Sequence, residues 1–483
     1  MMESAVEKNK IGFFRLVGLA IGGTIGGGVF SLSGDMAAKG AHTGAILLGW
    51  AICGIGMLGL VMCFYWLNQS KPELTGGISS YASEGFGKFI GFNSAWGYWI
   101  SAIFSNVSFI TFMFAALGFF FPIFEKGNNL PALIGGSIII WLVTLLISQG
   151  IKDASGINAF VTFSKIIPIF VFILAILSYH AFNWDIFMQN FWGTPESAPL
   201  LDQIKATSST TIWTFIGIEG AVVTSGRALR SKDVGYATVS SFLSVLAIYV
   251  MVSGLSMGVL PQEELAELGN PPLAGIMEYV VGPWGALLIN AAVIFSVAGA
   301  FLGYTIVSVD CAYAAGAQGV FNKFFAGTNK NGAPKNSLIL TNTLVQIFLI
   351  ILFFNSATYQ IFYFLAASMI MVPYLFCALY FTKICFSSKE AYANGFTPSF
   401  LAKLSGIVGS LYGCWLMYAS GPKGMLSSAI LYAIGIIFYH TSMKENNTAP
   451  WDRSIDKVLA VGIGLAAMAA IYLIYIGVID PFS

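Results

Sequence analysis

Charged residues are scarce in this chain. Only 9% of its 483 residues are Asp, Glu, Lys or Arg, whereas about 25% of a soluble domain is charged. Hydrophobic residues make up 57% of the chain, which excludes an ordinary soluble protein and indicates a polytopic membrane protein. The formal net charge is +1 and no basic cluster is present, so we expect no nucleic-acid partner.

Histidine and cysteine are also rare, and neither is arranged as a metal site. The three histidines are scattered, and the six cysteines lie in or beside apolar segments without metal-type spacing. We interpret them as packing residues and expect no metal and no cofactor. An enzyme would need a catalytic cluster, and we find none in the sequence.

Long apolar segments predict thirteen membrane-spanning helices, since about 20 apolar residues cross a bilayer. We place them at residues 11–33, 44–67, 93–121, 131–150, 157–180, 207–228, 236–259, 284–308, 337–354, 359–383, 404–421, 424–441 and 456–478. Residues 336–382 carry no charge and are too long for one span, so the chain must reverse near 355–358. We predict a second division between spans at 420–424, where the sequence SGPKG interrupts the apolar segment.

The distribution of Lys and Arg predicts the topology. With the N-terminal tail (1–10) in the cytoplasm, 18 of the 23 basic residues fall in inner segments and 4 in outer segments, as the positive-inside rule requires. We therefore expect a multi-pass protein of the cell (plasma) membrane, with its N-terminus cytoplasmic and its C-terminus extracytoplasmic. Residues 11–180 and 207–383 would form two five-helix halves of opposite orientation, followed by three additional helices at 404–478.

Two of the predicted spans are interrupted near their middle. The first contains five glycines within residues 22–28, and the second contains the sequence TFIGIEG at 214–220. Broken backbone at membrane depth is tolerated only where it lines a cavity or is buried in protein. Interrupted helices at corresponding places in two halves indicate the binding site of a secondary transporter.

The glycine-rich segment has two interpretations from sequence. The amides of Gly26, Gly27 and Gly28 open a half-helix whose positive dipole end suits a carboxylate, and carbonyls at Thr24, Trp213 and Ile216 would suit an ammonium. Alternatively, the glycines allow close helix packing, which fits Gly54, Gly56 and Gly59 better. A phosphate-binding loop is discounted because its flanks would not be apolar spans.

Two charged residues fall inside predicted spans. Glu219 needs a partner or a water-filled cavity at that depth, and we interpret it as a gating or proton-coupling residue. The alternative is a protonated glutamate that only holds the helix break together. Lys165 would either replace a bound metal cation and donate to carbonyls of the first break, or extend to the inner interface.

Aromatic and polar residues near the breaks complete the candidate site. Trp213 and Tyr304 could present ring faces to a cation, and Ser101, Ser105 and Asn106 could bind the distal end of a substrate. We assign Trp96 and Tyr98 to the aromatic belt at the membrane interface.

The chain resembles the amino acid–polyamine–organocation superfamily. The first helix is similar at residues 15–18 (RLVG) and 25–30 (IGGGVF). The basic amino acid/polyamine antiporter branch is indicated by residues 71–78 (KPELTGGI), 86–87 and 96–99 (WGYW). Residues 213–221 (WTFIGIEGA), 226–228 (GRA) and 233–235 (DVG) resemble arginine/ornithine-type antiporters. The similarity covers essentially the whole chain.

This resemblance implies an all-α, five-plus-five inverted-repeat (LeuT-like) fold with helices 1 and 6 unwound in mid-membrane. By position, Gly26, Gly27 and Gly28 would bind the carboxylate, and the carbonyls of Thr24, Trp213 and Ile216 the α-amine. Glu219 and Tyr374 would form an inner gate, and Lys165 would replace a sodium ion. The substrate side chain would face Ser101, Ala102, Asn106 and Phe109, with Tyr304 where relatives often carry tryptophan and Ala366 where an agmatine-exchanging relative carries serine.

We therefore expect an antiporter that exchanges an external amino acid for a related product by alternating access. The pairs considered are arginine/ornithine, histidine/histamine, lysine/cadaverine and tyrosine/tyramine. Because Glu219 is the only carboxylate predicted deep in the membrane, histidine/histamine is mildly favoured. The alternatives are a proton-coupled symporter of the same fold, a channel or a substrate sensor. The expected partners are small amino acids and amines and the lipid bilayer, with a homodimer as the candidate assembly.

Overall fold

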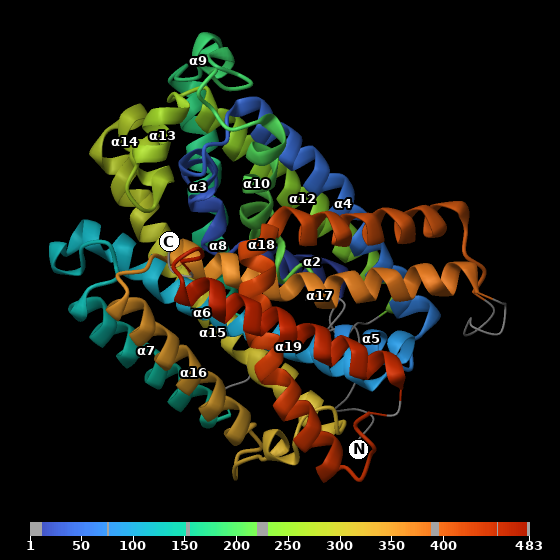
Figure 1. Ribbon diagram of the computed structural model, residues 1–483. Helices are drawn as coiled ribbons and strands as arrows, with labels where there is room; N and C mark the ends of the chain where they lie inside the picture. The colour runs from blue at the N-terminus through green and yellow to red at the C-terminus, as the bar shows by residue number, and fades with distance from the viewer. Residues whose placement is uncertain are drawn as a thin grey trace.

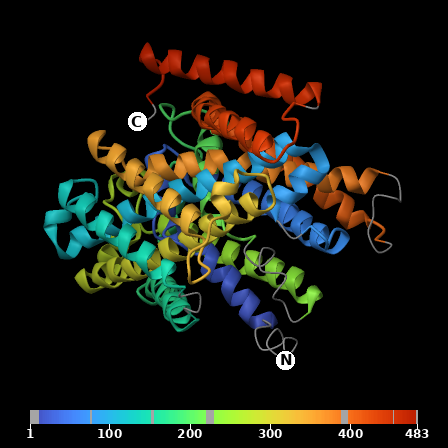
Figure 2. The same cartoon turned by 90° about the horizontal axis from the view of Figure 1, so that it is seen from below.

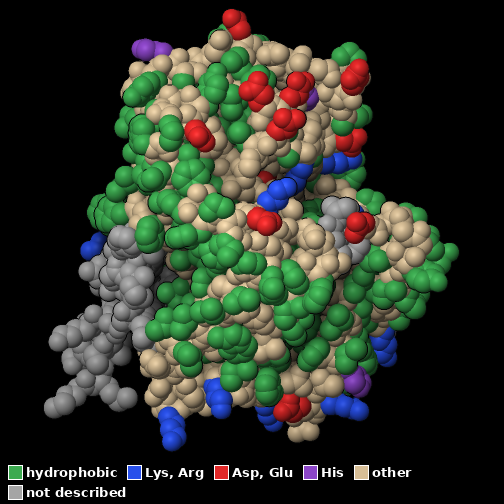
Figure 3. Space-filling model, turned by 90° about the vertical axis from the view of Figure 1, so that its left-hand side faces the viewer, with side chains coloured by type: hydrophobic (Ala, Val, Ile, Leu, Met, Phe, Trp, Pro, Cys, Tyr) green, Lys and Arg blue, Asp and Glu red, His purple; other side chains and the backbone are tan. Residues whose placement is uncertain are grey.

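α-Helices dominate the computed structural model, which describes residues 12–74, 77–150, 155–219, 230–387, 396–451 and 453–480 (Figure 1). No strand occurs within these ranges, and nine of their helices are long and apolar enough to cross a membrane. Figure 3 shows a broad band of hydrophobic side chains, with Lys and Arg mostly near its lower end and acidic side chains mostly toward its upper end. The chain is a multi-pass membrane protein.

The predicted spans of the first half correspond to helices in the structure. The first span is divided, because α2 (Phe13–Thr24) and α3 (Leu32–Ala38) are separated by a break that contains the short 3-10 helix η1 (Gly28–Phe30). The following spans are α4 (Thr43–Ser70), α6 (Lys88–Phe120), α7 (Leu130–Ser148) and α8 (Ser155–Ser178).

The second half has the same pattern. Its first span begins as α10 (Leu200–Phe215), which ends in mid-span, and the following spans are α12 (Ser231–Met257), α15 (Pro283–Ala317), α16 (Lys335–Phe354) and α17 (Tyr359–Phe386). Our predicted start for α6 and our predicted end for α15 are wrong by several residues. Both helices continue past the apolar segments on which the predictions were based.

The last predicted spans are α18 (Phe400–Glu445) and α19 (Ser454–Tyr475). Within α18, Gly421 has φ 65° and precedes Pro422, so the helix axis changes direction at the predicted division. Figure 2 shows α19 at the edge of the molecule, where it packs on α18. The total of thirteen spans stays a prediction, because α18 joins two helical segments across the kink at Gly421 and some spans are interrupted.

Several short helices were not predicted. They are α5 (Ile78–Phe86), α9 (Trp184–Met188), α13 (Gln262–Glu267), α14 (Pro272–Val281) and the 3-10 helices η2 (Pro122–Phe124) and η4 (Lys323–Ala326). They are too short to cross a bilayer, so a search for apolar segments does not detect them. α9, α13 and α14 lie together at the top of Figure 1, and α13 and α14 contact α3.

Corresponding helices of the two predicted halves make reciprocal contacts. α2 packs on α12, and α10 packs on α4, so the first helix of each half contacts the second helix of the other. Likewise α8 packs on α15 and α17 on α6, which pairs the fifth helix of each half with the third of the other. These reciprocal helix contacts place the two helix breaks side by side.

Some predictions fall on residues that the structure leaves undescribed. They include the tail 1–10, the GRA motif at 226–228 and the rest of the span 207–228 beyond Glu219.

Candidate functional site

The first break follows α2 directly. α2 ends at Thr24, and Ile25 (φ −74°, ψ 94°) leaves the helical conformation. Among described residues, no hydrogen bond is made by the amides of Gly26 or Gly27, while the Gly26 carbonyl accepts from Ser296 Oγ at 3.0 Å. The prediction that this span is broken is confirmed. The break leaves the amides of Gly26 and Gly27 without a hydrogen-bond acceptor among the described residues.

The glycines of this break also fit close packing. A Cβ added to Gly28 would lie 2.5 Å from Cγ2 of Thr214, and one added to Gly27 would lie 2.9 Å from the Phe112 ring. One on Gly26 would lie 3.3 Å from Phe109. The two interpretations of the glycines are therefore compatible: the break needs small residues because α10 and α6 approach it closely.

The second break lies against the first. α10 ends at Phe215, Ile216 is extended (φ −59°, ψ 129°) and Gly217 has φ +103°, which favours glycine. A Cβ on Gly217 would lie 3.0 Å from the carbonyl oxygen of Gly23, so the two broken backbones are neighbours.

A residue that the sequence analysis missed connects the two breaks. Tyr249, buried on α12, donates from its hydroxyl to the carbonyl of Thr24 at 3.3 Å and to that of Thr214 at 3.1 Å. Nothing in the local sequence marks this tyrosine, since its role depends on the packing of α12 against α2.

Glu219 is buried and accepts three hydrogen bonds. Its Oε1 accepts from Tyr98 OH at 2.8 Å, and its Oε2 accepts from Tyr374 OH at 2.7 Å and from the Gly217 amide at 3.1 Å. The structure thus brings Glu219 and Tyr374 together as the resemblance implied. Our assignment of Tyr98 and Trp96 to the interface belt is wrong: Tyr98 reaches Glu219, and buried Trp96 donates to the Leu431 carbonyl at 3.0 Å.

Lys165 lies inside the protein. It is 2% exposed, and its Nζ donates to the carbonyl of Gly22 at 2.9 Å, in the last turn of α2. The alternative in which this lysine extends to the membrane interface is therefore wrong.

The carbonyls predicted to bind an ammonium already have one donor each. Thr24 O accepts from Tyr249 OH, Trp213 O from the Ile216 amide at 3.2 Å, and Ile216 O from Tyr304 OH. A carbonyl oxygen has two lone pairs, so each can accept a second donor.

The residues predicted to face a substrate side chain gather around α6. Phe109 packs against the rings of Trp213 and Tyr304, with centroids 5.9 and 5.2 Å away. Asn106 Nδ2 donates to Thr305 Oγ1 at 3.3 Å, while its Oδ1 is buried with no partner among described residues. Ala102 is buried, and Ser101 Oγ donates to the carbonyl of Ala366 at 2.8 Å, so Ser101 is already committed to α17.

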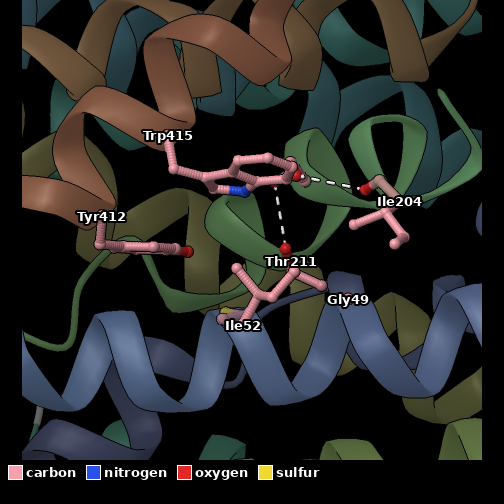
Figure 4. Close-up of a pocket in the computed structure, with 8 residues that line it drawn as sticks. Gly49, Ile52, Ile204, Thr211, Tyr412 and Trp415 are labelled. Carbon is pink, nitrogen blue, oxygen red and sulfur yellow. Dashed lines mark hydrogen bonds between the residues drawn. The ribbon is translucent and has the colours of Figure 1, made fainter. Parts of the chain in front are cut away.

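The hollow drawn in Figure 4 is a separate feature. It lies between α4, α10 and α18 and is lined by residues that include Ile52, Thr211, Tyr412 and Trp415. None of the predicted site residues lines it.

Comparisons with known proteins agree with this architecture. The family model described as amino acid permease matches residues 11–442. The arginine/ornithine antiporter of Pseudomonas aeruginosa is 40% identical over 99% of both chains. The putative arginine/ornithine antiporter of Escherichia coli K12 is 39% identical over 96% of this chain and 98% of its own.

A third relative, the arginine/agmatine antiporter of Chlamydia abortus, is 39% identical over 98% of both chains. The similarity extends over nearly the whole length in each case. The chain belongs to the amino acid permease family, within the amino acid–polyamine–organocation superfamily.

Proposed function

We propose that this protein is a secondary active antiporter that exchanges an external amino acid for a related amine or amino acid. The observation that carries the proposal is the contact between two broken helices, in which Gly217 of the second break lies against the carbonyl oxygen of Gly23. In the first break the amides of Gly26 and Gly27 make no hydrogen bond among the described residues. The relatives named as arginine/ornithine and arginine/agmatine antiporters support exchange as the mode of transport.

The backbone at the breaks would recognise the α-carbon groups of the substrate. The amides of Gly26, Gly27 and Gly28 would bind the carboxylate. The free lone pairs on the carbonyls of Thr24, Trp213 and Ile216 would accept from the ammonium. At Ile216 the substrate would share the carbonyl with the Tyr304 hydroxyl or displace it.

The side-chain pocket would discriminate between substrates through few polar atoms. Asn106 Oδ1 is an unused buried acceptor, and the rings of Phe109, Trp213 and Tyr304 can hold a cation or a planar group. Ser101 and Ala102 would bound the pocket on α6. Glu219 is held by three donors, so it is poorly placed to neutralise a second positive charge. This favours histidine with histamine, whereas the names of the relatives favour arginine with ornithine.

Transport would proceed by alternating access around the breaks. The first two helices of each half would rock against the others. Tyr98, Glu219 and Tyr374 would close the inner side, and Lys165 would hold the end of α2 in place of a metal cation. We further propose five-helix halves at 11–180 and 207–383, additional helices at 404–478, a cytoplasmic N-terminus, an extracytoplasmic C-terminus and assembly as a homodimer.

Counterflow in proteoliposomes tests the exchange. Vesicles loaded with histamine, ornithine, agmatine, cadaverine or tyramine are given the corresponding labelled amino acid outside. We expect uptake only when a cognate internal substrate is present, and its identity fixes the pair. Uptake into empty vesicles driven by a pH gradient would instead establish the symporter, and flux far above transporter turnover would indicate a channel.

A further inference from the structure

Lys39 follows the last residue of α3 and connects three helices. Its Nζ donates to Ser209 Oγ at 2.8 Å and Thr210 Oγ1 at 3.1 Å on α10, and to Tyr363 OH at 2.8 Å on α17. An ammonium has three donors, so all three are used, and Nζ also lies 4.7 Å from the centroid of the Tyr363 ring. These contacts hold α3 against α10 and α17.

The partners of Lys39 are neutral although a carboxylate lies one turn away on the same helix. Asp35 is 2% exposed, and its Oδ1 accepts from Tyr359 OH at 2.7 Å and Gln360 Nε2 at 3.2 Å. Its Oδ2 is buried with no hydrogen-bond partner in the described part of the chain, where no ion pair joins Asp35 to Lys39. Opposite charges four residues apart on a helix can pair, yet here each is bound to neighbouring helices.

This cluster lies on one side of the helix breaks, and the Glu219 cluster lies on the other. Tyr363 and Tyr374 are eleven residues apart on α17, or about 16 Å along the helix axis, and they contact Lys39 and Glu219 respectively. The Tyr363 ring also stacks on Trp213, with centroids 4.6 Å apart and planes 19° apart. The Lys39 contacts therefore cover the aromatic side of the proposed substrate site.

We propose that Lys39 is the latch of the outer gate and that it alternates between two sets of partners. In the closed position it binds the hydroxyls of Ser209, Thr210 and Tyr363. In the open position it leaves them and pairs with Oδ2 of Asp35, so that α3 separates from α10 and α17. The assignment of this latch to the outer gate rests on the proposed function, because it assumes that α3 faces the extracytoplasmic side.

The two positions explain the choice of partners. Three hydroxyls satisfy the donors of the Lys39 ammonium without a negative charge. Because no ion pair has to be broken, Lys39 can leave these partners when substrate binds. The unpartnered Asp35 Oδ2 provides an acceptor that moves with Lys39, because Asp35 lies in α3 and Lys39 directly follows the last residue of that helix. A gate with two alternative sets of contacts is bistable, as an alternating-access cycle requires.

Cysteine accessibility tests the latch without any substrate. Ser209, 8% exposed, is changed to Cys in a background in which the exposed Cys414 is changed to Ala. A membrane-impermeant maleimide is then applied from outside. In this background we expect K39M to raise the labelling rate at least tenfold and K39R to raise it less. D35N, which removes the open-state partner, should lower the rate.

A matched control uses Lys205, which is also on α10 but pairs with Asp202 at 3.1 Å. K205M should leave labelling unchanged. A second readout is the half-saturation concentration for exchange measured from each side of oriented vesicles. K39M should lower the external value and raise the internal one, whereas a merely structural lysine would change both alike.

Two outcomes would overturn the proposal. In the first, K39M and D35N leave the labelling rate of the Ser209→Cys background unchanged. In the second, K39M changes the half-saturation concentration for exchange equally on the two sides of the membrane. If K39M does not fold, D35N still decides, because it retains Lys39 and its closed contacts with Thr210 and Tyr363. Labelling needs no transported substrate, so a failed counterflow experiment would refute the exchange proposal and leave this test intact.

Discussion

At the scale of single residues, the carboxylate of Glu219 joins three parts of the chain. Tyr98 on α6, Tyr374 on α17 and the amide of Gly217 all donate to it. In Glu219→Gln, the amide nitrogen cannot accept, so one donor faces another, and an unpaired buried donor costs about 1–3 kcal/mol. We expect the exchange rate to fall at least tenfold and its pH dependence to change. Transport assays over a pH series check this, with exposed Glu278→Gln as the control; an unaltered rate and pH profile would leave Glu219 a structural residue only.

Tyr249 is a second residue whose hydroxyl has a clear contribution. Tyr249→Phe removes the donor shared by the carbonyls of Thr24 and Thr214 but keeps the buried ring. We expect a loss of stability of about 1 kcal/mol, seen as a lower melting temperature, and a reduced exchange rate because the two breaks lose their connection. Tyr472→Phe, on the exposed surface of α19, should change neither quantity.

At the scale of helices, the close approach of α10 to the first break sets the limit on side-chain size. A methyl group at Gly28 would meet Cγ2 of Thr214 at 2.5 Å, so Gly28→Ala should abolish most exchange. Thr214→Ser removes that methyl group and keeps the hydroxyl, which donates to the Thr211 carbonyl. We therefore expect the double variant to recover much of the activity. Gly254→Ala, where nothing lies within 4 Å, is the control.

Failure of Thr214→Ser to rescue Gly28→Ala would contradict the packing explanation. It would leave the Trp213 ring, whose Cζ3 would lie 3.2 Å from the added Cβ, or the direct role of the Gly28 amide as the reason for glycine. Recovery in the double variant would establish the contact with Thr214 as the main limit on side-chain size.

The elements show which parts of the site can be predicted from sequence and which cannot. Clustered glycines and the buried charges of Glu219 and Lys165 predict the breaks and their importance, because an isolated lipid-facing helix would not tolerate them. Tyr98 and Tyr249 carry no such signal, since an intramembrane tyrosine is usually a packing or interface residue. Lys39 lies just beyond the first predicted span, and its three hydroxyl partners come from helices distant in sequence. Contacts of this kind depend on tertiary packing.

At the scale of the whole molecule, the distribution of charge predicts how the chain lies in the membrane. One face shows basic side chains gathered near one end of the hydrophobic band and acidic ones mostly toward the other (Figure 3). The basic end should face the cytoplasm. Thirteen crossings would then place the C-terminus outside.

Tags removed by an external protease test this topology. In intact spheroplasts, we expect a tag at the C-terminus to be cleaved and a tag at the N-terminus to be cleaved only after permeabilisation. A tag inserted near Glu196, after α9, should be cleaved from outside, whereas one near Asn331, between η4 and α16, should be protected. If the internal tags behave as expected but the C-terminal tag is protected, the number of crossings after α16 is wrong by one. The reversal at residues 355–358 separates α16 from α17 in the structure, so that error would lie at Gly421, with α18 crossing only once, or in α19 remaining on one side of the bilayer.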